Sequence, residues 1–207
     1  MQRSGLFMLL ALFYSVFLIC AGLLHFRSGL PPIKGGAALD QFNAAMLWVT
    51  SIIALLIAAE HTKPAWKVLF WLAVSAGFAA LAIDEIEVVQ FHEATMDSWG
   101  DDDYIKMLAW ACAGIGAYAI CRVARPARAV AGSLAFAFAF QTLWLLSDMG
   151  DGDFFSVPIP LEYLAWLEEY FEILASQFYL TALILHFQDL RGTGAAQERR
   201  WQAGLSA

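Results

Sequence analysis

Long apolar segments separated by short polar connections dominate this chain of 207 residues and limit what it can fold into. Each apolar segment approaches the roughly 20 residues that a helix needs to cross a bilayer core. Only 15% of the residues are charged, which is too few for a soluble domain of this length. The sequence therefore predicts an all-α polytopic membrane protein, a bundle of six transmembrane helices that contacts the lipid bilayer. The predicted spans lie at about 6–26, 42–59, 65–83, 104–121, 129–146 and 161–187.

The predicted six-helix transmembrane domain covers residues 1–190, and a polar tail covers residues 191–207. Six spans place both termini on the same side of the membrane. Most of the 12 Lys and Arg residues fall on that side, and only Arg27, Lys34 and Lys106 fall opposite. The positive-inside rule then places both termini and the tail in the cytoplasm, as in a multi-pass protein of the bacterial inner (cytoplasmic) membrane.

The acidic residues are distributed in the opposite way. Most of the 19 Asp and Glu residues fall on the predicted outer side, and the net charge is −7. Nucleic acid is excluded as a partner, because no basic stripe is present to neutralise phosphates. Asp and Glu contribute little to membrane orientation, so this asymmetry calls for a separate explanation.

One part of that explanation is the stretch that follows the third apolar segment. Asp84, Glu85 and His92 continue the predicted helix past residue 83, with no Gly or Pro between. On a helix, Glu85 and His92 lie two turns apart on one face. A carboxylate close to the hydrocarbon boundary is costly unless it is paired, protonated or bound to a cation.

A second acidic set opens the last apolar segment and lies on the same outer side. It contains Glu169 and Glu172, and Asp148 follows the fifth segment. Because helix packing can bring these ends together, we predict a divalent-metal site between the third and sixth helices. If the histidine participates, such a site suits iron, manganese or zinc, and if only oxygens bind, it suits calcium. The predicted metal ligands are Asp84, Glu85, His92, Asp148, Glu169 and Glu172.

Two other functions remain open. One is a non-catalytic accessory subunit of a larger respiratory or photosynthetic membrane complex, in which the acidic outer loops dock a basic partner. The other is a metal-dependent membrane hydrolase or oxidase, which needs an open coordination position and a metal-activated water. Small residues in the fourth and fifth segments suit either internal packing or a homo-oligomer. No catalytic residue follows from the pattern.

The four histidines raise the question of haem. They come from four different predicted helices with no paired spacing, which disfavours a bis-histidine haem site. Two of them, His61 and His186, fall at the ends of predicted spans, and we expect each to be satisfied at the membrane interface.

The acidic pattern also carries a resemblance. Asp84-Glu85 followed by His92-Glu93, and then by Glu168-Glu169 and Glu172 at a helix start, resembles uncharacterised bacterial multi-span membrane proteins. The resemblance covers two short stretches and implies no established activity or catalytic residue.

Overall fold

The computed structural model describes residues 37–61, 64–84, 102–124, 126–148 and 160–205. These residues form helices and contain no strand. The helices are α2 (Ala37–Glu60), α3 (Ala65–Asp84), α5 (Asp102–Ala124), α6 (Arg128–Asp148) and α7 (Leu161–Leu205). The all-helical prediction is confirmed for this part of the chain. The first predicted span, at 6–26, lies outside the described residues, so the sixth span stays a prediction, as does the orientation of the termini.

Five helices are long and apolar enough to cross a membrane. Their candidate spans are Phe42–Glu60, Ala65–Ile83, Met107–Ala124, Arg128–Ser147 and Trp166–Gly192. Each agrees to within a few residues with a segment expected from the sequence, except that the last one extends further. Helix α7 runs on to Leu205, past residue 187, where its apolar stretch was expected to end. Residues 188–205 lack proline and contain three Ala, three Gln and three Arg, which favour helix whatever the polarity of the surroundings.

Prolines mark the starts of three of these helices. Lys67 N–H donates to the carbonyl of Pro64 at 3.0 Å, and Tyr163 N–H donates to that of Pro160 at 2.9 Å. Pro126 likewise lies two residues before α6. A proline at a helix start suits the helix, because its fixed φ is helical and the amide it lacks has no partner there anyway.

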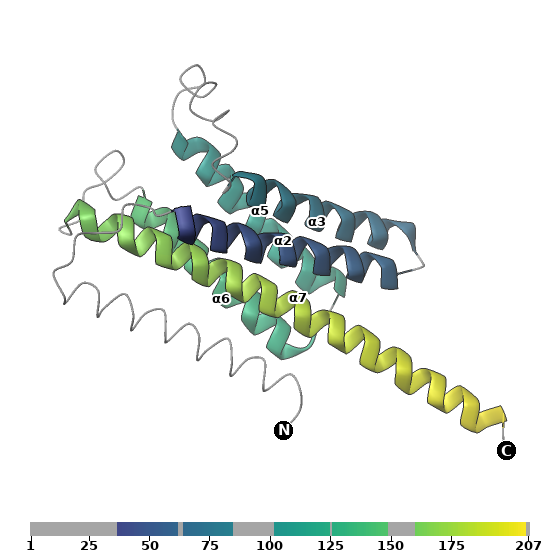
Figure 1. Ribbon diagram of the computed structural model, residues 1–207. Helices are drawn as coiled ribbons and strands as arrows, with labels where there is room; N and C mark the ends of the chain where they lie inside the picture. Colours follow the sequence, from purple (N-terminus) through teal and green to yellow (C-terminus); the bar gives the residue numbers. More distant parts are fainter. Residues whose placement is uncertain (1–36, 62–63, 85–101, 125, 149–159, 206–207) are drawn as a thin grey trace.

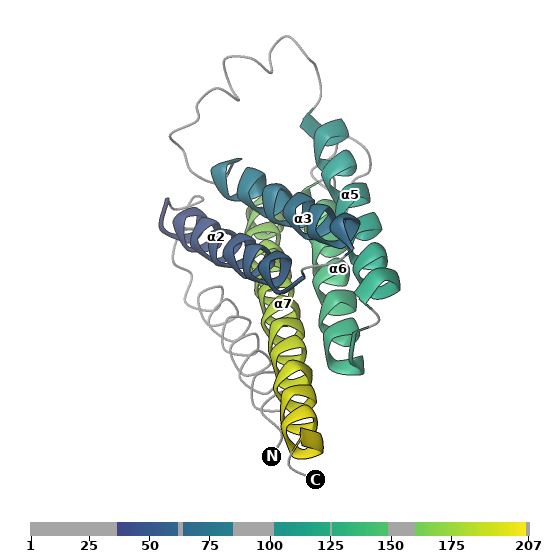
Figure 2. The ribbon, with the colours of Figure 1, turned by 90° about the vertical axis from the view of Figure 1, so that its right-hand side faces the viewer.

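Helix α7 is the central element of the bundle. It packs against α6 and α2, while α3 packs on α2, and α5 packs mainly on α6. Figure 2 shows α2 on one side of α7 and α5 with α6 on the other, while α3 crosses in front. The C-terminal part of α7 extends beyond the other helices (Figure 1).

The two ends of the bundle differ in their connections. At one end, which we call the connector end, α2 is linked to α3 and α5 to α6. At the other, the acidic end, α3 finishes at Asp84, α5 begins at Asp102 and α6 finishes at Asp148. The positive-inside prediction places the connector end in the cytoplasm.

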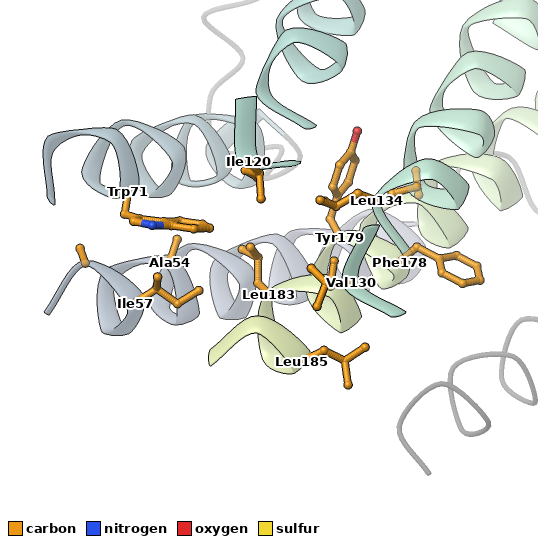
Figure 3. Close-up of a cluster of buried hydrophobic side chains, with 14 residues drawn as sticks. Ala54, Ile57, Trp71, Ile120, Val130, Leu134, Phe178, Tyr179, Leu183 and Leu185 are labelled. Carbon is orange, nitrogen blue, oxygen red and sulfur yellow. The ribbon is translucent and has the colours of Figure 1, made fainter. Parts of the chain in front are cut away.

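A cluster of buried apolar side chains, shown in Figure 3, lies towards the connector end of the described bundle. It joins Ala54 and Ile57 of α2, Trp71 of α3 and Leu183 of α7, among others. Small residues on α2 let the broad indole of Trp71 approach closely, and such close approach is how helices gain packing energy in lipid. The cluster therefore ties α2, α3 and α7 together at this end.

Glycine allows the close contact between α5 and α6. A Cβ added at Gly114 would lie 2.7 Å from Cε2 of Phe138, whereas one added at Gly116 would meet nothing within 4 Å. The Phe138 ring stacks on Trp110 with centroids 5.4 Å apart, and Trp110 Nε1 donates to Thr142 Oγ1 at 2.9 Å.

We expect Gly114→Ala to be less stable than Gly116→Ala by about 1 kcal/mol, the scale of one aromatic pair. Both changes raise helix propensity equally, so the difference isolates the displaced Phe138 ring. Unfolding titrations with SDS in mixed micelles, followed by circular dichroism, measure it. Equal stabilities of the two variants would contradict the contact.

Candidate functional site

Two ring contacts define the register between α3 and α7. Trp71 stacks on His186 with centroids 5.3 Å apart, and Phe78 meets Tyr179 edge-on at 5.5 Å. Seven residues forward on α3 are thus matched by seven residues back on α7. The helices are antiparallel, and the facing stripe of α7 carries His186, Tyr179 and, one heptad further, Glu172.

Two contacts of α2 give its depth in the bundle. Ser51 Oγ lies 2.9 Å from Ser75 Oγ, and Glu60 Oε1 lies 3.6 Å from Arg191 Nε. The spacing from Ser51 back to Asn43 along α2 places Asn43 at the depth of the last turn of α3. The spacing from Glu60 back to Asn43 places it at the depth of Leu174 on α7. Glu172 lies about 3 Å further out along α7.

Asn43 is the most unusual polar residue at that depth. Its side chain is 2% exposed, and neither Oδ1 nor Nδ2 has a hydrogen-bond partner among the residues that the structure describes. Burying an amide without partners costs several kcal/mol where no water is available. Its carbonyl oxygen is also a hard ligand of the kind that binds divalent cations.

The carboxylates at the start of α7 lie at the same end. Glu168, Glu169 and Glu172 are half-buried, in the first turns of the helix. Glu168 and Glu172 share the stripe that continues to Tyr179 and His186, whereas Glu169 lies about a quarter-turn away from it. The α3-facing side of α7 therefore begins with two carboxylates.

The predicted metal ligands are described to different extents. Glu169 and Glu172 are described fully. Asp84 and Asp148 are the last residues of α3 and α6, so their backbones lie at the acidic end, but their side chains are not described. Glu85 and His92 lie outside the described residues. Within the part of the chain that the structure covers, no three His, Cys, Asp or Glu side chains form a group able to hold a metal ion.

Two polar contacts occupy the middle of the bundle, one between α7 and α6 and the other between α2 and α3. Tyr179 OH donates to Gln141 Oε1 of α6 at 2.7 Å. Ser51 Oγ donates to the Ser75 carbonyl at 2.9 Å, and Ser75 Oγ donates to the Ser51 carbonyl at 3.0 Å. Because each hydroxyl reaches the backbone of the other helix, α2 and α3 are in close contact there.

At the connector end, the structure corrects the expectation for His186. Instead of facing the interface, it is 4% exposed, and its Nε2 has no hydrogen-bond partner within the described residues. Trp71 is fully buried, and its Nε1 likewise has no hydrogen-bond partner within the described residues. The sequence did not indicate this burial, because the position of a histidine near a span end does not show whether its side chain faces the bundle interior or the interface.

His61 lies close enough to His186 for the two imidazoles to interact electrostatically. It directly follows α2, and its N–H donates to the Ala58 carbonyl at 3.1 Å. Burial, and then the positive charge of Lys67, lower the pKa of His61, while Glu60 partly offsets this. A neutral imidazole is thus favoured beside the buried one.

Apolar helices long enough to span a bilayer, packed around a few buried polar side chains, define this fold as a helical bundle of the integral-membrane type. The chain belongs to the family described as Domain of unknown function (DUF8692), whose model matches residues 31–187. Comparisons with curated proteins and with solved structures find no match.

Proposed function

We propose that this protein is an integral membrane protein of the bacterial inner membrane that binds a divalent cation at its acidic end, between α3 and α7. Asn43 and Glu172 are the described residues to which we assign binding. The ligands predicted from the sequence, Asp84, Glu85, His92, Asp148 and Glu169, complete the set.

Asn43 is the observation that carries the proposal. An amide buried in an apolar bundle, with no partner among the residues that the structure describes, is expected to be retained for a ligand. Its depth matches that of the half-buried carboxylates of α7. A cation held there offsets both the desolvated amide dipole and the carboxylate charge.

The register of α3 on α7 supports the sequence hypothesis that the two acidic sets meet. The Trp71–His186 and Phe78–Tyr179 contacts are one heptad apart on both helices. The same register brings the end of α3, at Asp84, close to the depth of Glu172 on α7. Carboxylates gathered at a membrane boundary are stabilised by a bound proton or cation, which is the role we propose for this end of the bundle.

The test is the cation content of the full chain purified in detergent. After equilibration with Mn²⁺, Zn²⁺ or Ca²⁺ and desalting, we expect a stoichiometric cation by elemental analysis. Glu172→Gln should weaken binding roughly tenfold or more. Glu60→Gln is the matched control, because Glu60 is a carboxylate at the opposite end, exposed and paired with Arg191.

Asn43→Leu separates ligation from packing. If Asn43 binds the cation, the variant loses cation while it retains the fold. If the amide is only buried, leucine stabilises the bundle and leaves the cation content unchanged. That result, or a wild-type chain without any of the three cations, contradicts the proposal and directs attention to a partner complex.

A further inference from the structure

We infer that the outer face of α5 binds an anionic phospholipid whose phosphate pairs with Arg122 at the connector end. This lipid site is separate from the proposed cation site, which lies at the other end of the bundle. The bilayer contact that all the apolar helices make is thereby narrowed to one kind of lipid on one helix face.

Helix α5 is the least covered of the described helices. Only 6% of its candidate span is buried, compared with 67% for α7. It packs mainly on α6, through the face that carries Trp110 and Gly114. The opposite face carries Leu108, Ile115 and Tyr118, whose exposed fractions are 64%, 69% and 65%. In a bilayer, this outer face meets lipid unless another molecule covers it.

The exposed side chains form one strip along α5. Leu108, Ile115, Tyr118 and Arg122 lie within about a quarter-turn of one another around the helix axis. At 1.5 Å per residue the strip is about 21 Å long, which exceeds the roughly 15 Å of hydrocarbon in one leaflet. One acyl chain can therefore lie along the strip while its headgroup lies beside Arg122.

Arg122 supplies a positive charge at the connector end of this strip. Its guanidinium carbon lies 6.0 Å from the ring centroid of Tyr118, one turn earlier, so the ring holds the charge next to the strip. No carboxylate among the described residues pairs with Arg122, whereas Arg191 at the same end pairs with Glu60. The guanidinium donors are thus free for a phosphate, whose oxygens match them in a bidentate arrangement.

The charge of Arg122 favours an anionic lipid over the other possible occupants of this face. A second copy, related by a two-fold axis along the membrane normal, would place two Arg122 side chains at the same depth, where like charges repel. Phosphatidylcholine carries its own cation, which competes with the arginine for the phosphate. An anionic lipid presents a phosphate without that competing charge.

The test is native mass spectrometry of the full chain in detergent with equal amounts of phosphatidylglycerol and phosphatidylcholine that carry the same acyl chains. EDTA removes divalent cations, which could otherwise bridge phosphates to carboxylates. We expect the wild-type chain to retain phosphatidylglycerol in preference. Arg122→Gln should weaken phosphatidylglycerol binding about fivefold, the effect of one basic residue near an anionic headgroup. Arg122→Lys keeps the charge and should retain most of the binding.

Two charge-matched variants serve as controls. Arg128→Gln removes a positive charge from the same end, but at the start of α6, and Lys106→Gln removes one from α5, but near the acidic end. Both should bind phosphatidylglycerol about as well as the wild type. An equal loss in Arg128→Gln would show that the whole end attracts the lipid, and it overturns the site on α5. Equal binding of the two lipids by the wild type overturns it as well.

Cys112 reports which molecule covers the outer face, because it is exposed and lies midway along α5. With Cys20 and Cys121 replaced by serine, a fluorophore on Cys112 should be quenched more by phosphatidylglycerol with brominated acyl chains than by brominated phosphatidylcholine. Arg122→Gln should remove the difference. A disulfide-linked dimer through Cys112 in membranes, with equal quenching by both lipids, would identify a second copy as the occupant and contradict the lipid site.

Discussion

Trp71→Ala is expected to lower the free energy of unfolding by about 3–5 kcal/mol, the largest effect of any single change considered for this bundle. The indole is fully buried within the apolar cluster that includes residues of α2, α3 and α7. It stacks on His186 and meets Phe70 edge-on at 5.4 Å. Alanine leaves a cavity that the small residues of α2 cannot fill, so dispersion contacts are lost on several sides.

The matched control is Trp66→Ala, five residues earlier on the same helix. Trp66 is 51% exposed and contributes a cation–π contact with Lys67, with Nζ 5.9 Å from the ring centroid. Its removal should cost about 1 kcal/mol or less. Unfolding with SDS in mixed micelles, followed by far-UV circular dichroism, compares the two variants. Similar losses for both would show that Trp71 is not the anchor of the cluster.

Ser75→Leu is expected to cost about 2–4 kcal/mol. The larger side chain separates two helices whose hydroxyls and carbonyls now lie 2.9–3.0 Å apart, and overpacking typically costs 1–3 kcal/mol. The interhelical hydrogen bonds that are lost contribute about 0.6 kcal/mol each in a bilayer. The same SDS titration measures the sum.

Ala76→Leu controls for the added volume and the apolar character of leucine. Ala76 is exposed on the lipid-facing side of α3, next in sequence to Ser75. Leucine there should leave stability within about 0.5 kcal/mol of wild type. If Ser75→Leu behaves in the same way, the close contact between α2 and α3 does not hold in the membrane.

The amino-acid sequence predicted the elements well because their cause is local. The length of each apolar run is set by the bilayer, and Pro64 and Pro160 mark helix starts through their own backbone geometry. The end of α7 was placed too early, because apolarity stops near residue 187 while helix propensity continues. Glu169 and Glu172 were predicted to bind a cation because carboxylates beside an apolar run are costly, and that assignment stays a prediction.

Residues at the ends of the bundle show how far this local reasoning extends. Asp84 and Asp148 were assigned to the acidic end from the order of the spans, and α3 and α6 do finish there. The contacts of Glu85 and His92 stay predictions. Asn43 was overlooked, since an isolated asparagine early in a span gives no sign of whether its amide has a partner.

By itself, the sequence determined which segments are helices that suit a membrane and at which end the acidic residues gather. The tertiary structure alone decided which faces of those helices meet. Helices that are apolar all round carry no periodic signal for an inner face, and packing in lipid depends on shape rather than on hydrophobicity. The burial of His186 against Trp71 and the depth of Asn43 are therefore properties of the assembled bundle.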